Sequence, residues 1–446
     1  MSCLRDAWRS TIDNLKFLTM KKYFLIITAI CLSCAALMAE PVSKQKALQI
    51  ASQVMDAKNG MKKAPALNTL KAEAVFGKVD AKGNPYLYAV CGKESGGYVL
   101  VSGDDRYAEV LGYSDEGQFD ADNMPDAMRE WVMGYIETIR ELDAKGFAPA
   151  RVVYDTPSWP AILPMTSTLW YQLMPYCNDL PMINGLPSVT GCSTTAVAQL
   201  INYWAKKTGQ PAGTTSVIPA YQTKSGIQME ELPVTTFDWS KIIDDYASGA
   251  TDEQEAEVAK LFLYVAYALK VEFGTTVSGG SSGEDKNVIP ALTGYFGFDQ
   301  TATFEQRARY SLADWTELVY NELSHQRPVL CGAGNGAGVG HAFLVDGYDG
   351  DGMFHVNWGW SGRSNGYYRM SVLDPSSIDD WDAPVSNTSF QNALCALIGA
   401  QIGMEQPAEM VPPSVLWGDM TIEGTTLSNV AINMEKDNEN LLLPME

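Results

Sequence analysis

Histidine is scarce in this chain, which has three among 446 residues: His325, His341 and His355. Histidine-rich metal sites are therefore nearly excluded, and a catalytic histidine base has very few candidates. Basic residues are also in deficit, because 32 Lys and Arg face 53 Asp and Glu and leave a formal net charge of -21. A surface this acidic repels phosphate backbones, which argues against a nucleic-acid-binding protein. No apolar run reaches the ~20 residues that a membrane-spanning helix needs.

The amino end has the pattern of an export signal. Met20-Lys21-Lys22 precedes the apolar stretch 23–39, and a positive segment followed by a short apolar one and a small residue is typical of a secretory signal. We expect cleavage after Ala39, with residues 1–19 as an extension upstream of a better start at Met20. Cys34 leaves a lipid anchor as a second possibility. The sequence therefore predicts a secreted or cell-envelope protein.

Cysteine usage fits an exported protein with a free thiol. Without the signal, five cysteines remain, so at least one cannot pair within the chain, and none forms a Cys-x-x-Cys pair. Catalysis is one reason to keep such a thiol, although most single cysteines are buried small apolar residues. The five are Cys91, Cys177, Cys192, Cys331 and Cys395.

The chain divides into two α+β units. At 48.7 kDa and 46% hydrophobic residues it has enough apolar material for more than one core. The first unit covers 40–150, with strands expected at 98–101 and 108–111 and a linker rich in Gly and Pro from 145 to 160. A helix between these features carries an apolar face of Met128, Trp131, Tyr135, Ile139 and Leu142.

The second unit covers 151–400 and changes from helical to β patterns along its length. Helices are expected from Cys192, from a capping box at Thr251 and Gln254, and from a cap at Ser311. Strands are then expected at 328–331, 341–348, 353–358 and 366–370, with a hairpin turn at Asp349-Gly350. Residues 401–446 are weakly patterned and are expected to be a tail or a truncated further domain.

Cys192 is a candidate nucleophile because it follows Thr190-Gly191 and opens a predicted helix. The positive end of a helix dipole stabilises a thiolate, which is the reactive form of cysteine. A cysteine nucleophile needs an imidazole that takes its proton. His341 follows the glycine-rich segment 332–340 and opens an apolar strand, which can place it at a cleft. These glycines, Gly340 included, would let a substrate backbone approach closely.

His355 is a second candidate base, and residue patterns alone leave the choice open. In His355-Val356-Asn357-Trp358, strand alternation places His355 and Asn357 on one face and the other two residues on the opposite face. The amide of Asn357 can hold an imidazole in one tautomer, and the indole of Trp358 can shield that bond from water. Upstream, Gln172 could donate to a developing oxyanion together with the backbone N–H of Cys192.

Taken in chain order, these segments resemble the streptopain family of papain-like cysteine peptidases. The resemblance covers roughly 40–400 and rests on GCSTTAVAQLINYW, GHAFLVDGYDG, HVNWGW and TLWYQLMPYCNDLP, with GGYVLVSGDDRYAEVLGYSDEGQFD in the first unit. It implies an α+β, papain-like fold of two lobes, a helical lobe and an antiparallel sheet lobe, with a cleft for extended peptide. It also implies that the first unit is a pro-domain that inhibits the enzyme from within the chain.

The resemblance assigns a role to each candidate residue. Cys192 would be the nucleophile, His341 the base, Asn357 its orienting partner, Trp358 the shield and Gln172 an oxyanion donor, with no metal or organic cofactor. The loop 278–283 resembles a segment that lines the substrate cleft in this family. Its expected substrate-binding residues are Ser278, Gly279, Gly280, Ser281 and Ser282, together with Gly340.

The chain departs from the family pattern at two points. Ser193 and Thr194 stand where small or branched apolar residues are more frequent, and Gln172 precedes Cys192 by a longer segment than in plant papains, so that segment must fold back. The predicted function is a secreted cysteine endopeptidase made as a zymogen, with protein or peptide substrates. The alternatives are a transglutaminase-like acyl transferase and a non-catalytic binding protein on a peptidase scaffold.

Overall fold

The computed structural model describes residues 41–58, 67–92, 96–144, 159–334, 340–371 and 394–403, together with the backbone of 415–422 and 425–433. The predicted export signal, residues 145–158 of the linker predicted at 145–160, and residues 335–339 of the glycine-rich segment lie outside the described residues.

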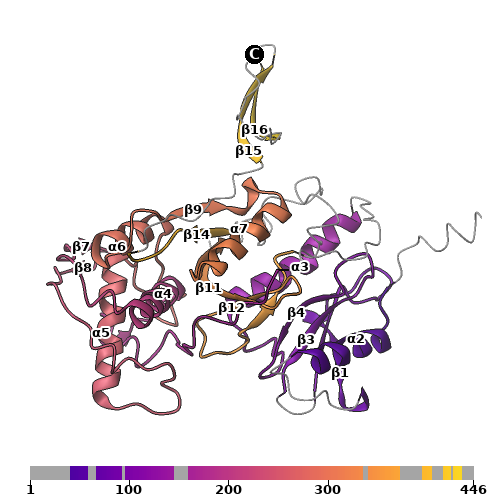
Figure 1. Ribbon diagram of the computed structural model, residues 1–446, viewed down its shortest axis with the longest axis horizontal. Coiled ribbons are helices and arrows are strands. Elements are labelled where there is room, and N and C mark those ends of the chain that lie inside the picture. The colour runs from indigo at the N-terminus through magenta and orange to yellow at the C-terminus, as the bar shows by residue number, and fades with distance from the viewer. Residues whose placement is uncertain are drawn as a thin grey trace, which may run out of the picture.

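The described helices and strands follow the predicted succession of an α+β chain, and Figure 1 shows their arrangement. The amino-terminal unit contains α2 (Lys44–Ala57), β1 (Lys71–Ala74), β2 (Leu87–Cys91), β3 (Tyr98–Ser102), β4 (Val110–Ser114) and α3 (Asp126–Ala144). The second unit begins with β5 (Met182–Ile183), β6 (Leu186–Pro187), α4 (Cys192–Thr208), β7 (Tyr221–Gln222), β8 (Gln228–Met229), α5 (Asp252–Ala268) and α6 (Val288–Tyr295). It continues with β9 (Thr303–Gln306), α7 (Leu312–Ser324), β10 (Val329–Gly334), β11 (Gly340–Tyr348), β12 (Phe354–Asn357), β13 (Gly366–Tyr368) and β14 (Cys395–Ile398).

The strands of both units belong to one antiparallel sheet. Its ten strands run in the order β1-β2-β3-β4-β13-β12-β11-β10-β14-β9. The two units join where β4 pairs with β13 through Tyr113 opposite Tyr367 and Gly112 opposite Tyr368. Gly112 is required there, because a Cβ at this position would lie 2.5 Å from the ring of Tyr368. The amino-terminal unit is therefore an extension of the sheet that carries His341.

Helices cover both faces of this sheet. On one face, α3 and α7 share a core with inward-facing residues of β10 and β11 such as Cys331 and Phe343. On the other face, α4, α5 and α6 form the helical lobe against Leu330 and Leu344, while α2 covers β1–β3. Alternating residues of each strand thus enter opposite cores, as a sheet buried on both faces requires. The two lobes predicted for the second unit are this helical lobe and the sheet.

Local sequence signals placed several helices correctly. All five apolar residues predicted on one face of α3 are buried. The capping box at Thr251 and Gln254 begins α5, and the Ser311 hydroxyl accepts from Asp314 N at 3.1 Å to begin α7. The predicted hairpin turn after β11 is also present, since Asp349 N donates to Met353 O at 3.0 Å.

One predicted strand has other bounds in the structure, and the end of the chain contains strands for which no prediction was made. The strand predicted at 108–111 is β4 at Val110–Ser114, because its bounds follow its pairing with β3 and β13 rather than its own apolar run. The weakly patterned end of the chain contains a hairpin of β15 (Val415–Ile422) and β16 (Thr425–Asn433), which stands out from the sheet in Figure 1. Before it, Gln401 is fully buried and its carbonyl accepts from Asp299 N at 2.9 Å, so the second unit continues past residue 400.

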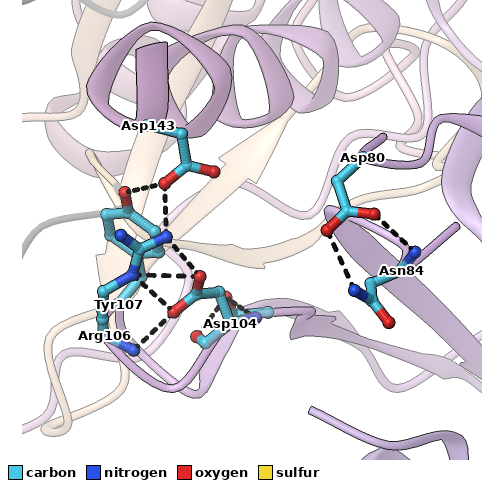
Figure 2. A network of polar contacts seen from close by, with 7 residues as sticks. Asp80, Asn84, Asp104, Arg106, Tyr107 and Asp143 are labelled. Carbon is cyan, nitrogen blue, oxygen red and sulfur yellow. Dashed lines mark hydrogen bonds and ion pairs between the residues drawn. The ribbon is translucent and has the colours of Figure 1, made fainter. Parts of the chain in front are cut away.

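Ion pairs hold α3 in place within the amino-terminal unit. Figure 2 shows Arg106 between Asp104 and Asp143, where its guanidinium donates to the Asp104 carboxylate at 2.5 Å and also to Asp143 at the end of α3. These bonds raise the pKa of Arg106, with the Asp104 hydrogen bond as the main cause. The loop after β3 is thereby tied to α3.

Candidate active site

Cys192 is the first residue of α4, as the sequence predicted. The residue before it, Gly191, has a φ of 79°. A Cβ on Gly191 would lie 2.4 Å from the carbonyl oxygen of Ser281, so both the backbone angle and the close approach require glycine. The thiol therefore stands at the positive end of a helix of 17 residues.

A cavity of about 470 Å³ opens beside this thiol. It lies between the start of α4, the start of β11, the loop 279–282 and the start of α3. The described residues that line it are Pro125, Asp126, Ala127, Tyr171, Gln172, Leu173, Val189, Cys192, Thr276, Gly279, Gly280, Ser281, Ser282, Gly340, His341, Ala342, Trp358 and Trp360. Segments that are far apart in the sequence thus meet at one opening.

The two candidate bases occupy different environments. His341 lines the cavity together with Cys192, whose Sγ lies 4.0 Å from the carbonyl oxygen of Gly340. His355 lies further along the sheet, where its Nδ1 is 2.5 Å from Oδ1 of the buried Asp346. The geometry therefore brings His341, and not His355, to the wall that carries the thiol.

Burial shifts the pKa values of both Cys192 and His341. Burial raises the pKa of the Cys192 thiol, and hydrogen bonds from Ala342 and Ser193 only partly oppose this effect. Burial likewise lowers the pKa of His341, although the carboxylates of Asp126 and Glu130 on α3 act in the opposite direction. Both shifts favour a neutral thiol and a neutral imidazole over a thiolate–imidazolium pair.

Asn357 lies behind the cavity wall rather than on it. Its side chain is buried, and its Nδ2 donates to Thr168 O at 2.9 Å and to Thr166 Oγ1 at 3.2 Å. Its Oδ1 accepts from Gly359 N at 3.1 Å, which leaves a second lone pair on that oxygen. The amide orientation is therefore fixed by three hydrogen bonds.

Trp358 does line the cavity, and it also contacts the amino-terminal unit. Its Nε1 donates to Ser364 O at 2.9 Å. Its ring meets the ring of Trp131 on α3 edge to face, at 5.9 Å between centroids. The predicted shield is therefore part of the surface on which α3 packs.

Gln172 reaches the cavity because the segment between it and Cys192 folds back. Its carbonyl oxygen accepts from Thr190 N at 3.1 Å, and the short β5–β6 hairpin lies within the closed segment. The longer spacing from Gln172 to Cys192 thus forms a loop whose two ends meet, and both residues line the cavity.

The predicted substrate loop is held against the nucleophile by Ser281. Its hydroxyl donates to Val189 O at 2.5 Å and accepts from Gly274 N at 2.9 Å. Gly279, Gly280, Ser281 and Ser282 line the cavity as predicted. Ser278 is outside that lining, where its Oγ accepts from Thr275 N at 2.7 Å and closes the turn.

The two residues after Cys192 differ in environment. Thr194 is fully buried, and its Oγ1 has no hydrogen-bond partner within the described residues. Ser193 packs close to Gly283, because a Cβ added to Gly283 would lie 3.2 Å from the Cβ of Ser193. Of the two departures from the family pattern, Thr194 is therefore the one that lies inside the core.

Several cavity residues carried no sequence signal. Pro125, Asp126 and Ala127 come from the start of α3, and a local pattern does not tell which surface a helix end will meet. Tyr171 and Trp360, which also line the cavity, form an edge-to-face pair at 5.1 Å, and a run of aromatic residues is equally typical of a core.

Two features are absent from the described ranges. These ranges contain no cluster of three or more His, Cys, Asp or Glu residues arranged to hold a metal ion. They also contain no helix with the length and apolar character needed to cross a membrane. All five cysteines in this part of the chain are free.

Comparisons with known proteins agree with this geometry. Residues 170–368 match the peptidase C10 family, and residues 39–139 match a family described as Spi protease inhibitor. The structure resembles a prointerpain A fragment from Prevotella intermedia with a TM-score of 0.62 and 25% identity, over 74% of this chain and 99% of that one.

Curated relatives are similar in sequence over most of the chain. Streptopain from Streptococcus pyogenes is 30% identical over 330 residues, which is 70% of this chain and 80% of streptopain. The thiol protease/hemagglutinin PrtT of Porphyromonas gingivalis is 30% identical over 379 residues, or 80% of this chain, but the match spans only 42% of PrtT. The chain belongs to the peptidase C10 family, the streptopain family of cysteine proteases, and carries the inhibitor-type domain of a zymogen at its amino-terminal side.

Proposed function

We propose that this chain is an exported cysteine endopeptidase, made as a zymogen, in which Cys192 and His341 form the reacting pair. The observation that supports these roles is the single cavity lined by a thiol at a helix N-terminus, an imidazole and the side chain of Gln172. The amino-terminal pattern of charge followed by an apolar stretch supports export.

The reaction follows from the chemistry of these groups. The thiolate of Cys192 attacks a peptide carbonyl carbon, and the negative charge that develops on the carbonyl oxygen is stabilised by Gln172 and by the Cys192 N–H. One such donor is typically worth ~10²–10³ in rate. The imidazolium of His341 then protonates the leaving amine, which gives a thioester. His341 next takes a proton from water, the resulting hydroxide attacks the thioester, and Cys192 is released.

The other candidate residues serve binding and orientation in this proposal. The Oδ1 of Asn357 accepts from the imidazole and holds its tautomer, and Trp358 keeps water from that bond. The backbones of Gly279, Gly280 and Gly340 and the side chains of Ser281 and Ser282 contact the extended substrate, with Ser278 shaping the loop. All steps use only groups of the chain and water.

The same geometry supports inhibition by the amino-terminal unit. Pro125, Asp126 and Ala127 line the same cavity as the loop 279–282, so a protein substrate would compete with α3 for this space. In this arrangement burial raises the pKa of Cys192 and lowers that of His341, and both shifts favour the neutral groups. We propose that cutting in the predicted linker at 145–160 precedes the release of α3.

Replacing Cys192 with Ala tests the proposal directly. The secreted Cys192→Ala protein, after its pro-domain is removed by an added protease, should have no thiol-dependent activity on casein. The matched control is Cys177→Ala, which removes another free, buried cysteine of the helical lobe and should keep activity. Casein cleavage by Cys192→Ala at the wild-type rate would show that the nucleophile is wrongly assigned.

The wild-type protein, processed in the same way, separates the other two functions. A transglutaminase-like enzyme would release ammonia from glutamine side chains without cutting the backbone. A non-catalytic binding protein would leave Cys192 unlabelled by the thiol-directed epoxide E-64, whereas the proposed enzyme should be labelled there and inactivated.

A further inference from the structure

A chain of polar groups lies behind Asn357, and the proposed reaction uses none of them. It starts at Asp346 on β11, whose carboxylate is fully buried. The pairing of β11 with β12 shifts by one residue between Val345 and Gly347, so Asp346 is the extra residue of a β-bulge. Bulges re-aim a side chain and are frequent near active sites. Burying a carboxylate costs free energy unless several donors hydrogen-bond to it, so the burial of Asp346 needs an explanation.

The Asp346 carboxylate is satisfied by donors from two different segments. Oδ1 is 2.5 Å from His355 Nδ1, and the ring of His355 is only partly exposed. Oδ2 accepts from the backbone N of Thr166 at 2.8 Å and from its Oγ1 at 2.5 Å. The second candidate base of the sequence thus has its Nδ1 engaged by a carboxylate away from the cavity.

The hydroxyl of Thr166 passes this constraint on to Asn357. A hydroxyl has one proton, and here the proton is given to Asp346, so its lone pairs remain for the amide of Asn357. Thr166 Oγ1 accepts from Asn357 Nδ2 at 3.2 Å, and Thr168 O takes the other proton of the same nitrogen at 2.9 Å. The amide cannot rotate by half a turn without placing its oxygen against a hydroxyl lone pair and a carbonyl. The Oδ1 of Asn357 therefore stays on the side of the amide that points away from Thr166 Oγ1 and Thr168 O.

We propose that Asp346, supported by His355 and acting through Thr166, is a positioning residue that keeps Oδ1 of Asn357 available to the imidazole of His341. The inference rests on the proposed function, in which Asn357 orients that imidazole. Its chemical content is directional, because an imidazole N–H needs an acceptor and would be repelled by the Asn357 amide hydrogens.

Tethering of the segment 162–168 to the sheet does not explain the carboxylate. The backbone already does this, because Met165 N donates to Asp346 O at 2.9 Å and Ile162 forms a two-way bridge with Tyr348. An apolar residue on the bulge would keep these backbone bonds without burying a charge. The carboxylate adds an acceptor for Thr166 N, a partner for His355 and a fixed direction for the Thr166 hydroxyl, and only the last of these acts on Asn357.

The test is Thr166→Val, which keeps the shape and the backbone N–H of Thr166 but removes the hydroxyl. In the processed enzyme we expect kcat on a peptide substrate to fall about 10–100-fold, the size found for the hydrogen-bond partners that orient metal-ligating histidines, with KM changed less than about twofold. Thr166→Ser should restore kcat to near the wild-type value. The matched control is Thr316→Val, because Thr316 is buried in α7 and its hydroxyl donates to Leu312 O at 2.7 Å, so kcat should not change.

A double-mutant cycle separates positioning from a merely structural effect. If Thr166 acts through Asn357, Thr166→Val should cost nothing further in an Asn357→Ala background. Full additivity would overturn the inference, and so would a Thr166→Val enzyme with wild-type kcat. Asp346→Asn serves as a second variant, and it should show the same fall in kcat and the same non-additivity. A wild-type kcat in Asn357→Ala alone would instead refute the role of Asn357 in the proposed function.

Discussion

Trp131 is the side chain of α3 whose truncation should most directly open the cavity. It is fully buried and meets Phe343 at 5.6 Å and Trp358 at 5.9 Å, both edge to face, on the surface of the second unit. Trp→Ala in a core costs about 3–5 kcal/mol. Since 1.36 kcal/mol is a factor of ten, the equilibrium between open and docked α3 would shift by about 10²–10⁴-fold. We expect the lower end, because Trp131 Nε1 donates to Tyr135 OH within α3 itself and part of the cost falls on that helix.

The assay is the rate at which Cys192 in the intact zymogen reacts with a maleimide that carries a large polyethylene glycol, followed as a gel shift. Trp131→Ala should accelerate this labelling about 10²-fold, if docked α3 blocks the reagent and opening is fast compared with labelling. Labelling of the buried Cys177 reports global unfolding and should stay slow. The matched control is Trp315→Ala, which removes an equally buried indole of α7. A Trp131→Ala zymogen that labels at the wild-type rate would refute the idea that α3 covers the thiol.

Three further predictions concern the same zymogen. Gly112→Ala places a Cβ 2.5 Å from the Tyr368 ring and should weaken the pairing of β4 with β13. In the Cys192→Ala zymogen it should therefore speed processing by added mature enzyme, followed on gels. Unchanged processing would mean that the β4–β13 junction does not hold the amino-terminal unit in place. Because burial raises the pKa of Cys192, its thiolate forms only as pH rises through the raised value. Alkylation by iodoacetamide should therefore begin at a higher pH in the zymogen than in the processed enzyme, and identical pH profiles would contradict this. Lys58→Met removes the ion-pair partner of the nearly buried Asp349 carboxylate, whose Oδ2 lies 2.8 Å from Lys58 Nζ. In urea titrations it should lower the free energy of unfolding by about 1–3 kcal/mol. An unchanged midpoint would show that the ion pair contributes nothing to stability.

Local signals predicted those parts of the fold that local interactions determine. The bounds of α5 and α7 follow from caps made within four residues, and α3 follows from apolar residues at helical spacing. The start of β4 was misplaced because pairing with β3 and β13 decides it. The union of both units in one sheet joins Gly112 to Tyr368, and no pattern within either segment indicates that contact.

The candidate site was predictable as a set of residue types but not as a network. The resemblance to a family supplied the order of Cys192, His341 and Asn357, while residue patterns alone could not choose between His341 and His355. The structure separates the two histidines through Asp346, which contacts Thr166 from 180 positions away. Such contacts depend on the bulge in β11, and a bulge leaves no period in the sequence that could be counted.

The junction between β4 and β13 has a consequence for the enzyme after processing. Departure of the amino-terminal strands turns β13 from an interior strand into a border strand with open amide and carbonyl groups, the kind of surface on which chains associate. β13 is three residues long: Tyr367 and Tyr368 pair across the junction, and next to them Arg369 N donates to Leu111 O at 3.0 Å. The exposed edge of β13 is therefore short, so the processed enzyme would gain little tendency to aggregate through it. For the same reason, few backbone hydrogen bonds would slow the separation of the amino-terminal unit.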